Sequence, residues 1–174
     1  MHLAQNGESG ILAVLHINED LDNSVHLAEK EKGFREYFEE KNHPGFQVQT
    51  LNLFSPDEPT FEKQLTTLLN EPQLKGIFVS TSKATYIIAS FLEKHNKGDI
   101  KLIGYDMLEE NIRYMKKGII NFLINQNPKR QAFLGINHLV GHLILKKEAP
   151  ASDLLPLEII SRENLDSYLS SGIH

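Results

Sequence analysis

The sequence predicts an α/β fold in which a doubly wound parallel sheet carries helices on both faces. Short apolar runs alternate with segments of helical periodicity about five times along the chain. The runs are too apolar for strands with one face in water, which indicates strands that are buried on both sides. A chain of 174 residues is long enough for one such domain and too short for two complete ones.

The first half of the chain supplies three expected strands and the helices between them. ILAVLHI is the first strand, and FQVQTLNLF, which alternates with a period of two, is the second. Each is followed by apolar residues at helical spacing, and KGIFVS then gives the third strand. The expected elements are strand 11–17, helix 24–41, strand 46–54, helix 57–70 and strand 75–80.

The second half continues the alternation. Apolar residues from Ala84 to Leu92 form one helical face, and Gly118 is suited to end a short helix. The expected elements are helix 84–92, strand 100–105, helix 107–117, strand 119–124, helix 128–147 and a last apolar run at 154–160 that leads into a short tail. The apolar residues of the helix from Pro128 spread around more than one face, so we expect this helix to pack against a second neighbour.

Composition excludes several functions for this stretch of chain. The net charge is −5 and Lys and Arg form no dense cluster, so these residues lack the positive footprint that binds nucleic acid. The absence of cysteine rules out thiolate catalysis and disulfides. No apolar run approaches the roughly 18 to 20 residues of a membrane helix. Met1–Gly10 is too polar for a secretory signal, and we expect this start to be a cut inside a longer protein.

Two weak metal motifs have simpler interpretations. His138 and His142 stand four residues apart, which is metal-ligand spacing on a helix, but the intervening Leu, Val and Gly include no general base. Asn18–Glu29 imitates a calcium loop, although Asn23 occupies the position of the usual glycine. A partly exposed helix and a solvated loop with a cap at Asn23 or Ser24 explain them better. The sequence also lacks phosphate-loop, dinucleotide-binding and hydrolase-elbow motifs, and we expect no metal or cofactor.

Polar residues follow the expected strands, where a doubly wound sheet binds its ligands. They are His16, Asn18, Ser55, Thr81, Ser82, Asp106, Asn125 and Gln126. Asp106 has two interpretations, since it is suited both to cap the next helix and to face a ligand, and we expect it to do both. A carboxylate among hydroxyls and amides, without a nucleophile and base nearby in sequence, suits binding of a polyhydroxylated ligand better than catalysis.

Several segments carry a family pattern in order and spacing. They are EKEKGF (29–34), GIFVSTSKATYIIASFLEKHN (76–96), IKLIGYDMLEENIRYMKKGIINFLINQNPKRQ (100–131) and LPLEIISREN (155–164). This pattern resembles the ligand-binding region of LacI-type transcriptional regulators, which is shared with type I periplasmic sugar-binding proteins. The resemblance implies that residues 1–127 are the carboxyl-terminal lobe of a two-lobed clamp, that 128–150 is a crossover helix belonging to a missing lobe, and that 151–174 is the returning strand and tail.

The resemblance assigns ligand positions where its motif matches. It implies that Asp106 accepts hydrogen bonds from sugar hydroxyls and that Gln126 is the polar residue after the crossover strand. Thr81 stands where many members have Asn, and Lys30 stands where they have Arg. Lysine is a point charge without the bidentate fork of arginine, so this departure leaves three alternatives open: a loss of sugar specificity, a different effector, or a solvated charge that contacts no ligand. His16 and Ser82, at neighbouring strand ends, complete the expected ligand-binding set.

Three functions are weighed on this basis. The first is the effector-binding part of a LacI-type regulator, cytoplasmic and homodimeric, which binds a carbohydrate and contacts DNA only through a missing amino-terminal helix-turn-helix. The second is the same clamp in a solute-binding protein or a membrane sensor, and the upstream sequence would separate these two. The third, a small α/β enzyme, is the weakest because no acid–base or nucleophile motif supports it.

Overall fold

The computed structural model describes residues 9–17, 25–40 and 45–170. Its elements are β1 (Gly10–Ile17), α1 (Val25–Glu40), β2 (Phe46–Leu53), α2 (Pro59–Leu69), β3 (Leu74–Val79), α3 (Ser82–Lys94), β4 (Lys101–Tyr105), α4 (Glu109–Lys116), β5 (Phe122–Asn125), α5 (Pro128–Leu143), β6 (Glu158–Ser161) and α6 (Arg162–Ser170). The alternation read from the sequence is therefore confirmed. The imagined calcium loop and its cap lie mostly outside the described residues.

One sheet joins these strands in the order β2-β1-β3-β4-β5-β6. Strands β1 to β5 are parallel, which confirms the doubly wound class, whereas β6 pairs with β5 in the antiparallel sense. The expectation of a wholly parallel sheet is wrong at this last strand. The chain leaves β5 at the carboxyl edge of the sheet and re-enters β6 at the same edge, so β6 must run in the opposite direction.

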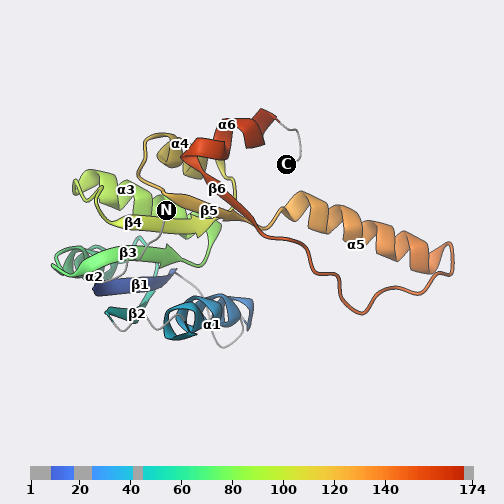
Figure 1. Cartoon of the computed structure of the whole chain (residues 1–174), viewed down its shortest axis with the longest axis horizontal. Coiled ribbons are helices and arrows are strands. Elements are labelled where there is room, and N and C mark those ends of the chain that lie inside the picture. Colours follow the sequence, from blue (N-terminus) through green and yellow to red (C-terminus); the bar gives the residue numbers. More distant parts are fainter. Residues whose placement is uncertain (1–8, 18–24, 41–44, 171–174) are drawn as a thin grey trace.

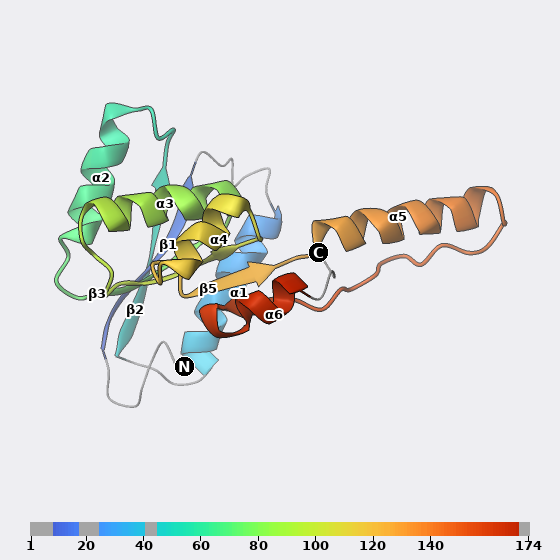
Figure 2. The same cartoon turned by 90° about the horizontal axis from the view of Figure 1, so that it is seen from above.

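Helices cover the two faces unequally. Helix α1 lies on one face, and α2, α3, α4 and α6 lie on the other (Figures 1 and 2). Strand β1 is buried on both faces: Leu15 and its alternate neighbours join the core beneath α2 and α3, while Leu12 and Val14 face the side of α1. This burial explains why β1 reads as a continuous apolar run and not as an alternation.

Two elements differ from those expected: β5 starts later, and a helix follows β6. Strand β5 starts at Phe122 because the N–H groups of Ile119 and Ile120 donate to the carbonyl of Tyr114, at 3.0 and 3.3 Å, and so belong to the end of α4. Gly118, with φ of +79°, supplies the left-handed turn expected there. Residues 162–170, most of which were read as a tail, form α6, which buries Leu165.

Helix α5 and the segment that returns to β6 form an arm that projects from the rest of the molecule (Figures 1 and 2). No residue of α5 is buried. The exposed apolar side chains of the arm are Phe133, Ile136, Leu139, Val140, Leu143, Ile144, Leu145, Leu154 and Leu157. The second neighbour expected for this helix stays a prediction. None of the helices in the described ranges combines the length and hydropathy needed to cross a bilayer.

Candidate ligand-binding site

Asp106 lies directly after β4 in a left-handed backbone conformation, with φ of +60°. Aspartate tolerates this conformation better than most residues, and such positions occur often at functional sites. Its N–H donates to the carbonyl of Ile124 at 3.0 Å. Helix α4 begins only at Glu109, with Leu108 as its N-cap residue, so the expectation that Asp106 caps this helix is wrong. Met107 and Leu108 therefore lie between Asp106 and the first residue of the helix.

The carboxylate of Asp106 is held by Gln126, and the two residues follow the adjacent strands β4 and β5. Oδ1 accepts a hydrogen bond from the backbone N–H of Gln126 at 3.2 Å. The side-chain Nε2 of Gln126 lies 3.4 Å from Oδ1 and 3.3 Å from Oδ2 and donates to both. An ionised carboxylate offers roughly four lone-pair positions, so it can accept further hydrogen bonds from a ligand.

Asn111 fixes the loop after β4 through its side chain, a role that was not predicted from the sequence. Its buried Nδ2 donates to the carbonyls of Ser82, Tyr105 and Asp106 at 3.0, 3.1 and 3.1 Å. Asn111 therefore joins the start of α3 to the loop after β4 and brings Ser82 close to Asp106. An asparagine early in a charged helix gives no sequence signal for such a role, because this position normally faces solvent.

Thr81 is the N-cap residue of α3, although its side chain makes no capping hydrogen bond. Its carbonyl accepts from the N–H and the hydroxyl of Thr85, at 3.2 and 2.7 Å. Thr85 also accepts from the N–H of Tyr105 at 3.2 Å, which ties the ends of β3 and β4 together. Thr81 and Ser82 are half-buried, so both lie at the surface of this carboxyl edge.

Lys30 reaches the same edge from α1. Its Nζ donates to the carbonyl of Ser80 at 3.2 Å and lies 3.7 Å from the centroid of the Tyr105 ring. An ammonium over a tyrosine face is a favourable cation–π contact. Burial, together with the nearby charge of Asp106, raises the pKa of Tyr105 to about 12, so this ring stays neutral at physiological pH.

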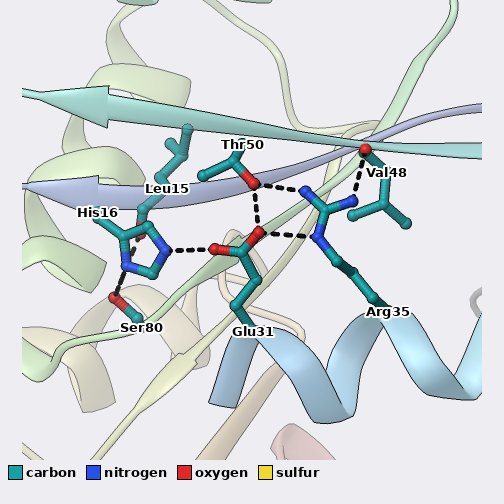
Figure 3. Close-up of polar contacts among 7 residues, drawn as sticks. All are labelled: Leu15, His16, Glu31, Arg35, Val48, Thr50 and Ser80. Atoms are coloured by element: carbon teal, nitrogen blue, oxygen red, sulfur yellow. Dashed lines mark hydrogen bonds and ion pairs between the residues drawn. The ribbon is translucent and has the colours of Figure 1, made fainter. Parts of the chain in front are cut away.

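His16 differs from the other expected ligand residues because it is buried, with 1% of its surface exposed. Its Nδ1 lies 2.8 Å from the Ser80 hydroxyl, and its Nε2 lies 2.8 Å from Oε2 of Glu31 (Figure 3). Both ring nitrogens thus have partners within the chain. The structure places His16 beneath the edge where Lys30 and Asp106 lie.

Glu31 is the centre of a polar cluster that runs from the buried His16 to the exposed Thr50. Its Oε1 accepts from Nε of Arg35 at 2.8 Å and from the hydroxyl of Thr50 (Figure 3). Burial would raise the pKa of the Glu31 carboxyl, but hydrogen bonds from Thr50, His16 and Arg35, together with the Arg35 charge, outweigh it and lower the pKa. The i, i+4 pair of Glu31 and Arg35 is visible in the sequence, where it reads as an ordinary surface ion pair.

Two hollows border the pair formed by Asp106 and Gln126. One, of about 280 Å³, is lined by Asp106 together with residues of the loop before α4 and of the start of α5. The other, of about 370 Å³, lies between α5 and the returning segment and is lined by Gln126, His138 and Asp153 among others. Asp106 and Gln126 therefore lie at the surface from which the arm departs.

The two histidines of α5 contact different groups. Nε2 of His138 lies 3.2 Å from Oδ2 of Asp153, and Nδ1 of His142 lies 3.2 Å from the carbonyl of Lys147. Within the described ranges, no three His, Asp or Glu side chains gather closely enough to hold a metal ion.

The fold and this edge define a lobe of the type I periplasmic-binding-protein class. Residues 2–148 match the family model described as periplasmic binding protein domain, and the chain belongs to this family. It is 29% identical over 136 residues to the xylose/arabinose-binding protein XylF of Sulfolobus acidocaldarius, a match that covers 70% of this chain and 31% of that protein.

Solved structures agree with this assignment. A candidate LacI transcriptional regulator from Bacteroides fragilis superposes with a TM-score of 0.83 and is 32% identical, over 94% of this chain and 56% of that one. The resemblance to the LacI ligand-binding region is thereby confirmed. A solute-binding protein from Actinobacillus succinogenes with bound D-allose has a TM-score of 0.75 at 22% identity, over 93% of this chain and 55% of that one, and shows the shared fold. The chain spans about half the length of these solved relatives and a third of the curated one.

Proposed function

We propose that this chain is the effector-binding part of a LacI-type transcriptional regulator and that its effector is a carbohydrate. The observation that carries the proposal is the Asp106 carboxylate, held by Gln126 at the carboxyl edge of the sheet. A fixed carboxylate accepts hydrogen bonds from neighbouring hydroxyls of a sugar without reorganising when the sugar arrives. Thr81, Ser82 and Lys30 add hydroxyls and one cation along the same edge.

The remaining parts of the clamp follow from the same proposal. Residues 1–127 and 151–174 belong to one lobe, while 128–150 is a crossover helix that packs on the other lobe. The exposed apolar side chains of α5 support this division, because they suit a covered surface and not a solvated one. DNA is contacted only by an amino-terminal helix-turn-helix in a cytoplasmic homodimer. The sugar prefers the closed clamp, and that difference in affinity shifts the population that binds DNA.

The proposal excludes catalysis by this lobe. Ser80, His16 and Glu31 follow one another in the order of a catalytic triad, with 2.8 Å between each pair of polar atoms. However, Ser80 and His16 are 0% and 1% exposed, so a substrate cannot reach the hydroxyl in this arrangement. A catalytic serine must contact its substrate, and the buried Ser80 hydroxyl does not meet this requirement. We therefore assign a structural role to these three residues.

A second candidate is the sugar-binding clamp of a solute-binding protein or a membrane sensor. The observation that favours it is the 29% identity with the xylose/arabinose-binding protein. Both candidates use the same carboxyl edge and differ in what the remainder of the protein does. The sequence upstream of this lobe distinguishes them: a basic helix-turn-helix indicates the regulator, and a signal peptide or apolar anchor indicates the receptor.

A thermal-shift screen tests the shared part of the proposal. The full-length gene product is heated with monosaccharides, disaccharides and sugar acids, beginning with D-xylose and D-arabinose, and the screen is repeated on Asp106→Ala. We expect at least one sugar to raise the melting temperature of the parent and not of the variant. No hit across the panel would overturn the carbohydrate assignment. A hit that survives in Asp106→Ala would overturn the site.

The regulator is then separated from the receptor by a second measurement. Binding of the full-length product to DNA fragments from its own upstream region is followed with and without the sugar found in the screen. We expect specific binding that changes with sugar. The absence of any upstream helix-turn-helix in the gene product would exclude the regulator and leave the receptor.

A further inference from the structure

We propose that Glu31 is a positioning residue for Lys30: it fixes where helix α1 lies on the sheet, and thereby where the Lys30 ammonium lies at the sugar-binding edge. The proposal rests on the proposed function, since Lys30 acts on a sugar only if that edge binds one. Glu31 itself does not contact the ligand in this account.

The Glu31 carboxylate joins three separate elements. Oε2 is bound by His16 of β1, while Oε1 is bound by Thr50 of β2 and by Arg35 one turn further along α1 (Figure 3). Arg35 continues outward, because its two terminal nitrogens donate to the carbonyl of Val48 at 3.0 Å and to Thr50 at 2.5 Å. Polar bonds thus fix the height of α1 above β1 and β2.

A second chain of contacts leads from Glu31 to the place where Lys30 ends. An ionised carboxylate has no proton to donate and acts solely as an acceptor. The hydrogen bond between Glu31 and His16 is therefore donated by Nε2 of His16. The other nitrogen of His16 holds the hydroxyl of Ser80, and the carbonyl of Ser80 accepts from Nζ of Lys30. Ser80 is fully buried and is therefore a rigid anchor. The Lys30 backbone and the acceptor of its ammonium are both fixed by groups that bind Glu31.

The contacts around Lys30 compensate for the flexibility of a lysine side chain. An ammonium on a four-carbon stem has no planar fork, and it loses more rotamer freedom for each hydrogen bond than a guanidinium does. Here the Ser80 carbonyl and the Tyr105 ring hold the ammonium from two sides. The position of Lys30 is then set by its supports and not by its own shape, which makes Glu31 a determinant of sugar affinity at a distance.

The first test needs no ligand and uses nuclear magnetic resonance on the 174-residue chain. Protons of the Lys30 ε-methylene near the Tyr105 face should be shifted upfield by the ring, and their signal is assigned by its loss in Lys30→Met. We expect Glu31→Gln to move this signal toward the position of the exposed lysines. Glu36→Gln is the matched control, because this exposed glutamate lies on the same helix and pairs with Lys32. It should leave the signal in place.

An unchanged Lys30 signal in Glu31→Gln would overturn the proposal, and so would an equal shift in Glu36→Gln. If Glu31→Gln does not fold, Glu31→Asp serves instead, because it keeps the charge and shortens the side chain by one carbon. We expect a smaller displacement of the same signal in Glu31→Asp. A signal identical to that of the parent would contradict the proposal.

The second test is a double-mutant cycle on sugar affinity in the full-length product, using the sugar that the thermal-shift screen identifies. We expect Glu31→Gln to weaken binding roughly fivefold in the parent and to have no further effect in Lys30→Met. If the affinity lost in the double variant equals the product of the losses in the two single variants, Glu31 acts independently of Lys30. That result would overturn the proposal. Failure of every sugar to bind the parent would overturn the proposed function, while the resonance test still decides the positioning role.

Discussion

The carboxylate of Asp106 and both amide groups of Gln126 meet across adjacent parallel strands, with donor–acceptor distances of 3.2 to 3.4 Å. Because the backbone N–H of Gln126 takes part, the orientation of the carboxylate is tied to the sheet and not only to another side chain. The contacts lie at the long end of the hydrogen-bond range, so a ligand can compete for the same oxygens. This pair is the part of the edge best suited to hold two neighbouring hydroxyls.

Asp106→Asn should weaken sugar binding by about 10- to 100-fold, because hydrogen bonds to an ionised group contribute about 1.5 to 3 kcal/mol. The substitution keeps the shape of the side chain and the bond from the Gln126 N–H. Affinity is measured by calorimetry on the full-length product, with the sugar from the screen. Asp99→Asn, an exposed residue before the amino end of the same strand, is the control and should bind as the parent does. Equal affinities in the parent and Asp106→Asn would contradict the site.

Gly104→Ala should destabilise the lobe, because a Cβ at this position would overlap the side chain of Thr85. Overpacking of this kind costs about 1 to 3 kcal/mol, and here it also disturbs the bond from the Tyr105 N–H to Thr85. Chemical denaturation measures the free energy of unfolding. Gly33→Ala is the matched control: a Cβ there meets nothing within 4 Å, and alanine in a helix should stabilise by about 0.5 to 1 kcal/mol. The two substitutions should therefore change stability in opposite directions.

The chain should self-associate through α5, because this helix exposes a run of large apolar side chains and buries none. Sedimentation of the 174-residue chain should show a dimer that dissociates on dilution. Ile136→Glu should weaken this association roughly tenfold or more, since a charge would enter the apolar contact. Asn137→Glu, at the next position of the same helix, is exposed and polar already and should have little effect. A strictly monomeric parent at high concentration would contradict the prediction.

Stability should fall in acid partly because of Glu31. Its pKa in the folded chain lies below the ordinary value of 4.5, so its contribution is fully present above that value and is lost as the pH falls through the folded pKa. The free energy of unfolding of the parent should therefore decrease more steeply below about pH 4.5 than that of Glu31→Gln. Denaturation at a series of pH values between 7 and 3 measures both curves. Parallel curves would contradict the assignment of this dependence to Glu31.

Periodicity in the sequence predicts most of the fold, because a buried strand and an amphipathic helix leave clear patterns. Strands β1 to β4 lie within a residue or two of their expected positions. The direction of β6 was not predictable in this way, since it depends on where the arm returns and not on the residues of the strand. The start of β5 was also missed, because Ile119 and Ile120 are as apolar as a strand while their N–H groups close the preceding helix.

The site was predictable where it depends on topology alone. Asp106 and Gln126 follow adjacent strands, and the carboxyl ends of parallel strands share one edge. The supporting contacts were not predictable, because they depend on which way a helix side chain points. Glu31 lies in a helix rich in charges and reads as solvated, yet its side chain is only 18% exposed. His16 follows the same logic in reverse: a polar residue at a strand end reads as ligand-facing, but here it lies beneath α1.

The pairing of Asn125 with Glu158 has a consequence for how this molecule can be rebuilt. The last residue of β5 and the first residue of β6 face each other in the ladder, so the whole arm leaves and returns at one rung of the sheet. In connectivity, the arm is an insertion at the tip of a β-hairpin. A tight two-residue turn could take its place without reordering any strand, because the ends it would join are already adjacent. The arm and the sheet are thus separable in the order of the chain, so the arm can be replaced while every strand of the sheet keeps its neighbours.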